Sequence, residues 1–175
     1  IVNSSAFEGG PSLSGNGLSL FFSSNRFGGS GSFDLWVATR PDLDADWGPP
    51  VNLGAQVNSP SGDVQPSVSA DGLVLFFQSE RSGRPDLWYA TRMSVTDEFG
   101  PASLFDIDPL GHASQADIMP DITYDGSSIM FTSFNRSGGL GGWDLWQIPI
   151  IPIVDFDGNE KVDTRDLLRL IESWG

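Results

Sequence analysis

The chain has 175 residues, of which 39% are hydrophobic, so it is long enough for one packed domain and a small additional module. Its 23 acidic and 9 basic residues give a formal net charge of -14, which would repel phosphate backbones and anionic lipid surfaces. We therefore expect no nucleic-acid partner. The 21 glycines and 12 prolines favour many short strands joined by tight turns, and the lack of cysteine excludes disulfides and thiolate metal sites.

No stretch has the composition of a membrane span or a signal peptide. Because the chain begins with Ile1 rather than methionine, we expect a processed product or an excised piece of a longer protein.

One pattern recurs three times along residues 8–150. Each copy contains a proline, a turn dipeptide, an apolar stretch, an arginine and an Asp-Leu-Trp triplet. The prolines lie 55 and 54 residues apart and the arginines 55 and 55 apart, which indicates a repeat architecture. These anchors are Pro11, Pro66 and Pro120; Arg26, Arg81 and Arg136; and the triplets that begin at Asp34, Asp86 and Asp144.

Each copy predicts a set of short strands. A first strand is expected directly after the proline, followed by a tight turn at Asn16-Gly17, Asp71-Gly72 or Asp125-Gly126, dipeptides that tolerate positive φ. The apolar stretch predicts a second strand and the triplet a third. A fourth is expected near residues 50–53 and 102–105, so the sequence predicts an all-β fold of four-stranded blades.

The pattern of proline, Ser-x-Asp-Gly turn, apolar strand, Ser-x-Arg and Asp-Leu-Trp resembles the WD40-like repeats of TolB-type β-propellers across residues 8–150. That resemblance implies propeller blades and a protein outside the cytoplasm, because the family covers periplasmic scaffolds, surface binding proteins and noncatalytic propellers of some peptidases. We expect a non-catalytic protein that binds a protein or glycan through its loop face. The alternatives are an accessory propeller of a larger secreted hydrolase and a surface-assembly subunit.

Three blades are fewer than the four to eight that close a propeller. The sequence leaves two ways to complete the ring. One is a homodimer with six blades, and the other is further blades upstream of this segment.

Residues 151–175 differ in composition and predict a separate module, a loop followed by an amphipathic helix. In a twelve-residue frame starting at Asp155, oxygen ligands fall at the positions that bind Ca²⁺ in EF-hand loops. The segment resembles one half of a type I dockerin repeat, although Glu160 occupies the position where an EF-hand has glycine. In the alternative reading, Asp163 caps the helix and no metal binds. The expected ligands are Asp155, Asp157, Asn159, Lys161 (through its carbonyl), Asp163 and Asp166.

A ligand or partner face is expected at one mouth of the propeller channel. Three acidic residues stand three positions before the repeat prolines, and the Gly-rich loops between the second and third strands open on the same side. The alternative is that the carboxylates are architectural. The candidate residues are Glu8, Asp63 and Asp117, with Phe27, Phe33, Leu140 and Trp143 on the loops.

The repeated arginines are expected to pair with Asp34, Asp86 and Asp144, and the triplet tryptophans to pack between blades. His112 is the only histidine and lies in a loop sequence without a nucleophile elbow. No carboxylate pair is recognisable as the acid and nucleophile of a glycosidase. We therefore expect no enzymatic activity.

Overall fold

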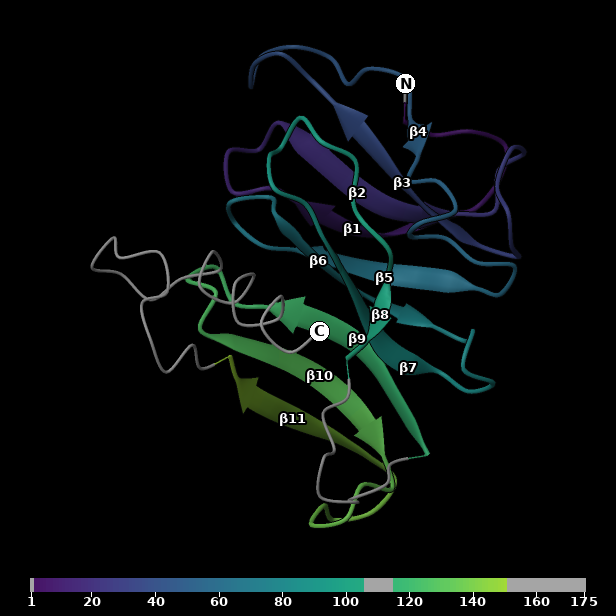
Figure 1. Ribbon diagram of the computed structural model, residues 1–175, viewed down its shortest axis with the longest axis vertical. Coiled ribbons are helices and arrows are strands. Elements are labelled where there is room, and N and C mark those ends of the chain that lie inside the picture. The colour runs from purple at the N-terminus through teal and green to yellow at the C-terminus, as the bar shows by residue number, and fades with distance from the viewer. Residues whose placement is uncertain (1, 106–114, 151–175) are drawn as a thin grey trace.

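The computed structural model describes residues 2–105 and 115–150, which form three antiparallel sheets without a helix (Figure 1). The first sheet contains, in order, β1 (Glu8–Leu13), β2 (Ser19–Ser24), β3 (Asp34–Thr39) and β4 (Val51–Asn52). The second contains β5 (Asp63–Val68), β6 (Val74–Ser79), β7 (Asp86–Thr91) and β8 (Ser103–Leu104). The third contains β9 (Ala116–Ile122), β10 (Ser128–Phe134) and β11 (Trp143–Pro149). We call these sheets blades 1, 2 and 3.

The all-β prediction is confirmed, and so is the four-stranded blade for the first two copies. Blade 3 has three strands within the part of the chain that the structure describes. The predicted calcium ligands at residues 155–166 and His112 lie outside the described residues, so the division of the chain into a propeller segment and a calcium module stays a prediction.

The first strand of each blade begins before the repeat proline and not after it, so the proline lies inside the strand. The register between the first and second strands shifts at this point in every blade. Proline cannot donate a ladder hydrogen bond, and a β-bulge is one of the few places where a strand accepts it. The residue before each proline has positive φ: 60° at Gly10, 56° at Gln65 and 55° at Met119.

The predicted turns form between the first and second strands. Gly17, Gly72 and Gly126 have φ values of 69°, 77° and 70°, which the turn requires and glycine adopts at no steric cost. In blade 1 the Asn16 side chain accepts hydrogen bonds from the Leu18 N–H and the Ser14 hydroxyl. The turn dipeptides were therefore correctly interpreted.

The blades stack in chain order, from the top of the view to the bottom (Figure 1), and the first strand of one blade contacts the blade before it. Backbone hydrogen bonds cross each boundary: Asp63 N–H donates to the Phe33 carbonyl, and Asp117 N–H donates to the Pro85 carbonyl, at 2.9 and 3.0 Å. Asp63 and Asp117 occupy equivalent positions in the repeat, so the sequence repeat produces the same contact at both blade boundaries.

The core lies between the blades, which is why an isolated blade could not bury it. One cluster joins Phe21 and Leu35 of blade 1 to residues of blade 2 such as Phe77. A second joins Phe76 of blade 2 to Phe131 of blade 3. Along each second strand, adjacent apolar side chains point to opposite faces, so both faces of blade 2 are covered by its neighbours.

Candidate functional site

The three acidic residues begin the first strands of their blades, as expected, but each is engaged by the arginine of its own blade. The Arg26 guanidinium contacts Glu8 at 2.9 Å, and Arg81 contacts Asp63 at 2.6 Å. In blade 3, Arg136 Nη2 lies 3.0 Å from Asp117 Oδ2. The Asp63 side chain is fully buried, that of Asp117 is buried, and that of Glu8 is partly buried.

The expected pairing of these arginines with the triplet aspartates is wrong. Arg26 and Arg81 follow the second strand by two residues, and their Nε–H groups donate to the hydroxyls of Ser24 and Ser79 at its end. Ser24 lies opposite Glu8 on β1 and opposite Asp34 on β3, and the Arg26 guanidinium turns to the first of these, Glu8.

Each arginine also lies over the tryptophan of its triplet. The guanidinium carbons are 5.2, 4.7 and 5.6 Å from the ring centroids of Trp36, Trp88 and Trp146, a cation–π geometry. Trp88 and Trp146 pack against the clusters between blades, so the expected packing between blades is confirmed for these two.

Glu8 has an additional partner. A hydrogen bond from the Ser4 hydroxyl, together with the Arg26 guanidinium, lowers the pKa of Glu8 below its ordinary value. With their charges matched by arginine, the three carboxylates fit the architectural reading that the sequence left open.

The triplet aspartates have a different role, which the sequence did not reveal. Asp34 accepts hydrogen bonds from the backbone N–H groups of Ser30 and Gly31 at 2.7 and 2.8 Å. Asp144 accepts from the N–H groups of Leu140 and Gly141 at 3.0 and 3.3 Å. Each carboxylate thus holds the Gly-rich loop that precedes it in a defined shape.

These loops carry most of the apolar candidates, and they lie at the end of the sheets where the first strands begin. Phe27 and Leu140 are essentially fully exposed, at 103% and 99%, and Trp143 is 53% exposed. Phe33 instead packs edge to face on Phe7, with ring centroids 5.6 Å apart. In blade 2 the corresponding loop carries Arg84, which is paired with Asp86.

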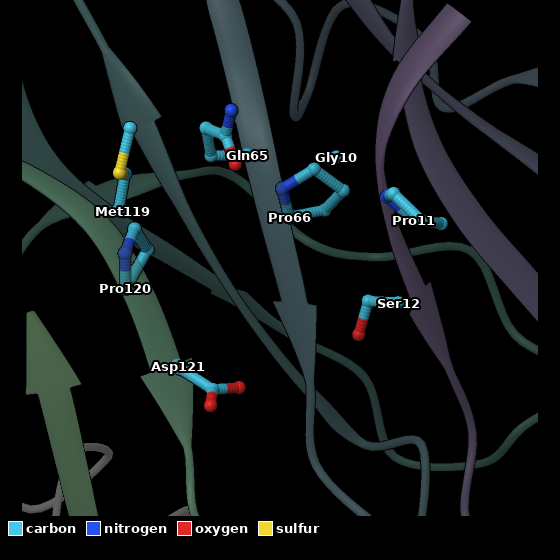
Figure 2. A pocket seen from close by; sticks show the side chains of 8 residues that line it. All are labelled: Gly10, Pro11, Ser12, Gln65, Pro66, Met119, Pro120 and Asp121. Atoms are coloured by element: carbon cyan, nitrogen blue, oxygen red, sulfur yellow. The ribbon is translucent and has the colours of Figure 1, made fainter.

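A second feature is a pocket of about 310 Å³ along the first strands (Figure 2). Its walls are the bulged segments around the three repeat prolines. The positive φ of Gln65 and Met119 is a conformation that non-glycine residues rarely adopt. The lining residues are Gly10, Pro11, Ser12, Gln65, Pro66, Met119, Pro120 and Asp121.

Among residues 2–105 and 115–150, no group of three His, Asp or Glu side chains has the arrangement of a metal site. No helix in this part of the chain could span a membrane. The predicted calcium ligands belong to the C-terminal residues outside these ranges.

Comparison with solved structures identifies the fold. TolB from Acinetobacter baumannii matches with a TM-score of 0.55 and 17% identity, over 81% of this chain and 30% of that one. The putative TolB from Agrobacterium tumefaciens matches with a TM-score of 0.57 and 17% identity, over 86% and 47%. The Hadza microbial sialidase Hz136 gives 0.47 and 15%, over 82% and 31%.

The chain therefore has the fold of TolB-like propeller blades, and it spans less than half the length of the TolB structures that it matches. No protein-family model and no curated protein matches it. At this level of identity the comparison concerns fold and not activity.

The ion pairs give a stability prediction. Asp63→Ala should lower the free energy of unfolding by about 3–5 kcal/mol, because it leaves the Arg81 guanidinium without its counter-charge in a mostly buried position. Glu8→Ala is the matched control and should cost clearly less, since the Glu8 carboxylate is 15% exposed, whereas Asp63 is completely buried and also accepts hydrogen bonds from Ser59. Urea denaturation of both variants measures the difference, and equal losses would contradict the assignment.

Proposed function

We propose that the protein is a non-catalytic propeller-type binding or scaffold protein that recognises a protein or glycan through the loops between the second and third strands. We call this surface the loop face and define it by Phe27, Phe33, Leu140 and Trp143. The predicted site residues Glu8, Asp63 and Asp117 lie at or near the starts of the first strands, at the same end of the sheets, and are paired with arginines.

The observation that carries the proposal is the combination of exposure and order in the loops. An exposed phenylalanine or leucine contributes most to binding when its backbone is already held in the bound shape, because less conformational entropy is lost. Asp144 provides that restraint at the Leu140 backbone itself, and Asp34 provides it at Ser30 and Gly31 in the loop that carries Phe27. Large apolar side chains at fixed positions on loops are typical of recognition surfaces.

The role is proposed as non-catalytic because the three carboxylates at the channel mouth are paired with arginines. A carboxylate in such a pair is poorly suited to exchange protons with a substrate. The alternative function, an accessory propeller of a larger secreted hydrolase, would use the same loop face to hold a substrate. This alternative would be favoured if the chain bound polymeric glycans and no protein.

Two further parts of the proposal concern the whole protein. We place it outside the cytoplasm, on the strength of the resemblance of its repeat to TolB-type propellers. Its three blades are proposed to contribute to a closed ring, which either a second copy of the chain, giving six blades, or further blades upstream of this segment would complete.

Loop-face binding can be tested with a glycan array and a panel of candidate proteins. Replacing Phe27 and Leu140 together by alanine should weaken each interaction at least about tenfold, as expected for loss of two contact side chains. Met93→Ala is the control, because Met93 is 75% exposed but follows β7 at the opposite end of blade 2. Unchanged binding by the double variant would contradict the assignment of the face.

Calcium binding by the C-terminal module is the second test. Titration calorimetry of the full chain should show one Ca²⁺ site that Asp157→Ala abolishes, since the third position of the loop supplies a side-chain ligand. Asp42→Ala removes an exposed carboxylate elsewhere in the chain and should leave the titration unchanged. Absence of a calcium signal from the unmodified chain would overturn the proposal.

A further inference from the structure

The pocket along the first strands (Figure 2) is the place where the three blades depart from their own repeat. All of its walls belong to β1, β5 and β9, with β5 in the middle, so described blades bound it on both sides. Its volume of about 310 Å³ lies within the range of small-molecule sites. Side chains that recur in every blade are generally architectural, so the departures are the candidates for a role of their own.

The first departure is at the residue before the repeat proline. It is Gly10 in blade 1, Gln65 in blade 2 and Met119 in blade 3, and all three have positive φ. Blade 1 shows that glycine satisfies the bulge, and glycine adopts this conformation at no steric cost. Gln65 and Met119 therefore occupy a disfavoured conformation that the bulge itself does not require of them. Residues of this kind are found at binding sites, and bulges there direct side chains toward a ligand.

The side chains at these two positions are available to a ligand. The Gln65 amide makes no hydrogen bond within residues 2–105 and 115–150, and Met119 is 53% exposed. Gly10 leaves room for the amide, because a Cβ at that position would lie 3.3 Å from Gln65 Oε1. The pocket thus offers one amide group and one polarisable thioether beside the rings of Pro66 and Pro120.

The second departure is at the residue after the proline. Ser12 and Ser67 occupy this position in blades 1 and 2, and their hydroxyls accept from Val68 N–H at 3.0 Å and Ile122 N–H at 2.9 Å across the blade boundaries. Blade 3 has Asp121 instead. Its carboxylate accepts a hydrogen bond from the Ser67 hydroxyl at 3.3 Å, which leaves most of its lone pairs for other donors.

Asp121 also gives the pocket its charge, since it is the one charged side chain among the lining residues. The carboxylates at the starts of the first strands are each paired with an arginine. No arginine of residues 2–105 and 115–150 forms such a pair with Asp121. With a net charge of -14 on the whole chain, the electrostatic field favours a cation here.

We propose that this pocket binds a cationic group on an apolar stem, an alkylguanidinium or alkylammonium. The cationic head donates charge-assisted hydrogen bonds to the Asp121 carboxylate. The stem lies against the proline rings and the Met119 thioether, and the Gln65 amide oxygen accepts a further N–H. Such a group is present in a basic side chain of a protein partner and in a free organic cation. The site is separate from the loop face and does not depend on what the loop face binds.

The test is a titration of the full chain with butylguanidinium, followed by NMR of the methionine methyl groups. The Met119 methyl signal should shift and saturate. The methyl signal of Met93, which is 75% exposed and follows β7, should stay in place. Butylurea has nearly the same shape without the charge, and it should bind at least about tenfold more weakly because hydrogen bonds between charged groups are lost.

Variants assign the binding to the named side chains. Asp121→Asn should weaken butylguanidinium binding about tenfold, and its amide oxygen can still accept from Ser67, so the fold is kept. Glu98→Gln is the matched control, because it removes the same charge from an exposed residue between β7 and β8 that does not line the pocket. Gln65→Gly should weaken binding without lowering the urea midpoint, since glycine accepts the positive φ.

A blocked Gly-Arg-Gly tripeptide distinguishes the two sources of the cation. Tighter binding of the tripeptide than of butylguanidinium indicates a protein partner, and equal binding indicates a free cation. An unmoved Met119 signal, equal affinity for butylurea, or full affinity in Asp121→Asn would overturn the inference. The double variant of Phe27 and Leu140 should bind butylguanidinium normally, so failure of the loop-face proposal is distinguishable from failure of this one.

Discussion

The other contacts depend on one ion pair in each blade, between a largely buried arginine and the carboxylate of the first strand. The arginine bonds the carboxylate of the first strand and lies over the tryptophan of the third, so one side chain ties the blade together across its sheet. Around Asp63, the same carboxylate also accepts from the Ser59 backbone and hydroxyl. The pair therefore fixes the segment that enters the blade as well as the blade itself. Removing either partner would leave the other charge buried and unpaired.

This local arrangement determines how blades stack. The first strand carries both the carboxylate and the N–H groups that bond the preceding blade. The ion pair that positions this strand therefore also positions the hydrogen bonds across the blade boundary. Apolar side chains on both faces of the second strand then fill the space between sheets. A unit of this kind is stable only with neighbours, and the triplet leucines that lie between two described blades, Leu35 and Leu87, are 0% and 1% exposed.

The sequence predicted the strands, the turns and the repeat because these depend on local patterns: alternating apolar residues, Asn-Gly and Asp-Gly dipeptides, and constant spacing. It misplaced the start of the first strand, since a proline normally suggests a strand end and only the bulge allows it inside. The pairing of arginine with the first-strand carboxylate depends on register between strands, which composition does not contain. The pattern did contain one overlooked signal, the constant place of the triplet aspartate directly after a Gly-rich loop.

Native-state hydrogen exchange tests the central claim, that stacked blades form one cooperative unit through their first strands. The amides of Asp63, Val68, Asp117 and Ile122 donate across the blade boundaries. The account predicts that these amides exchange only through global unfolding and are as protected as those in the middle of β6. Exchange as rapid as in exposed loops, with β6 still protected, would show that the blades do not stack in this way.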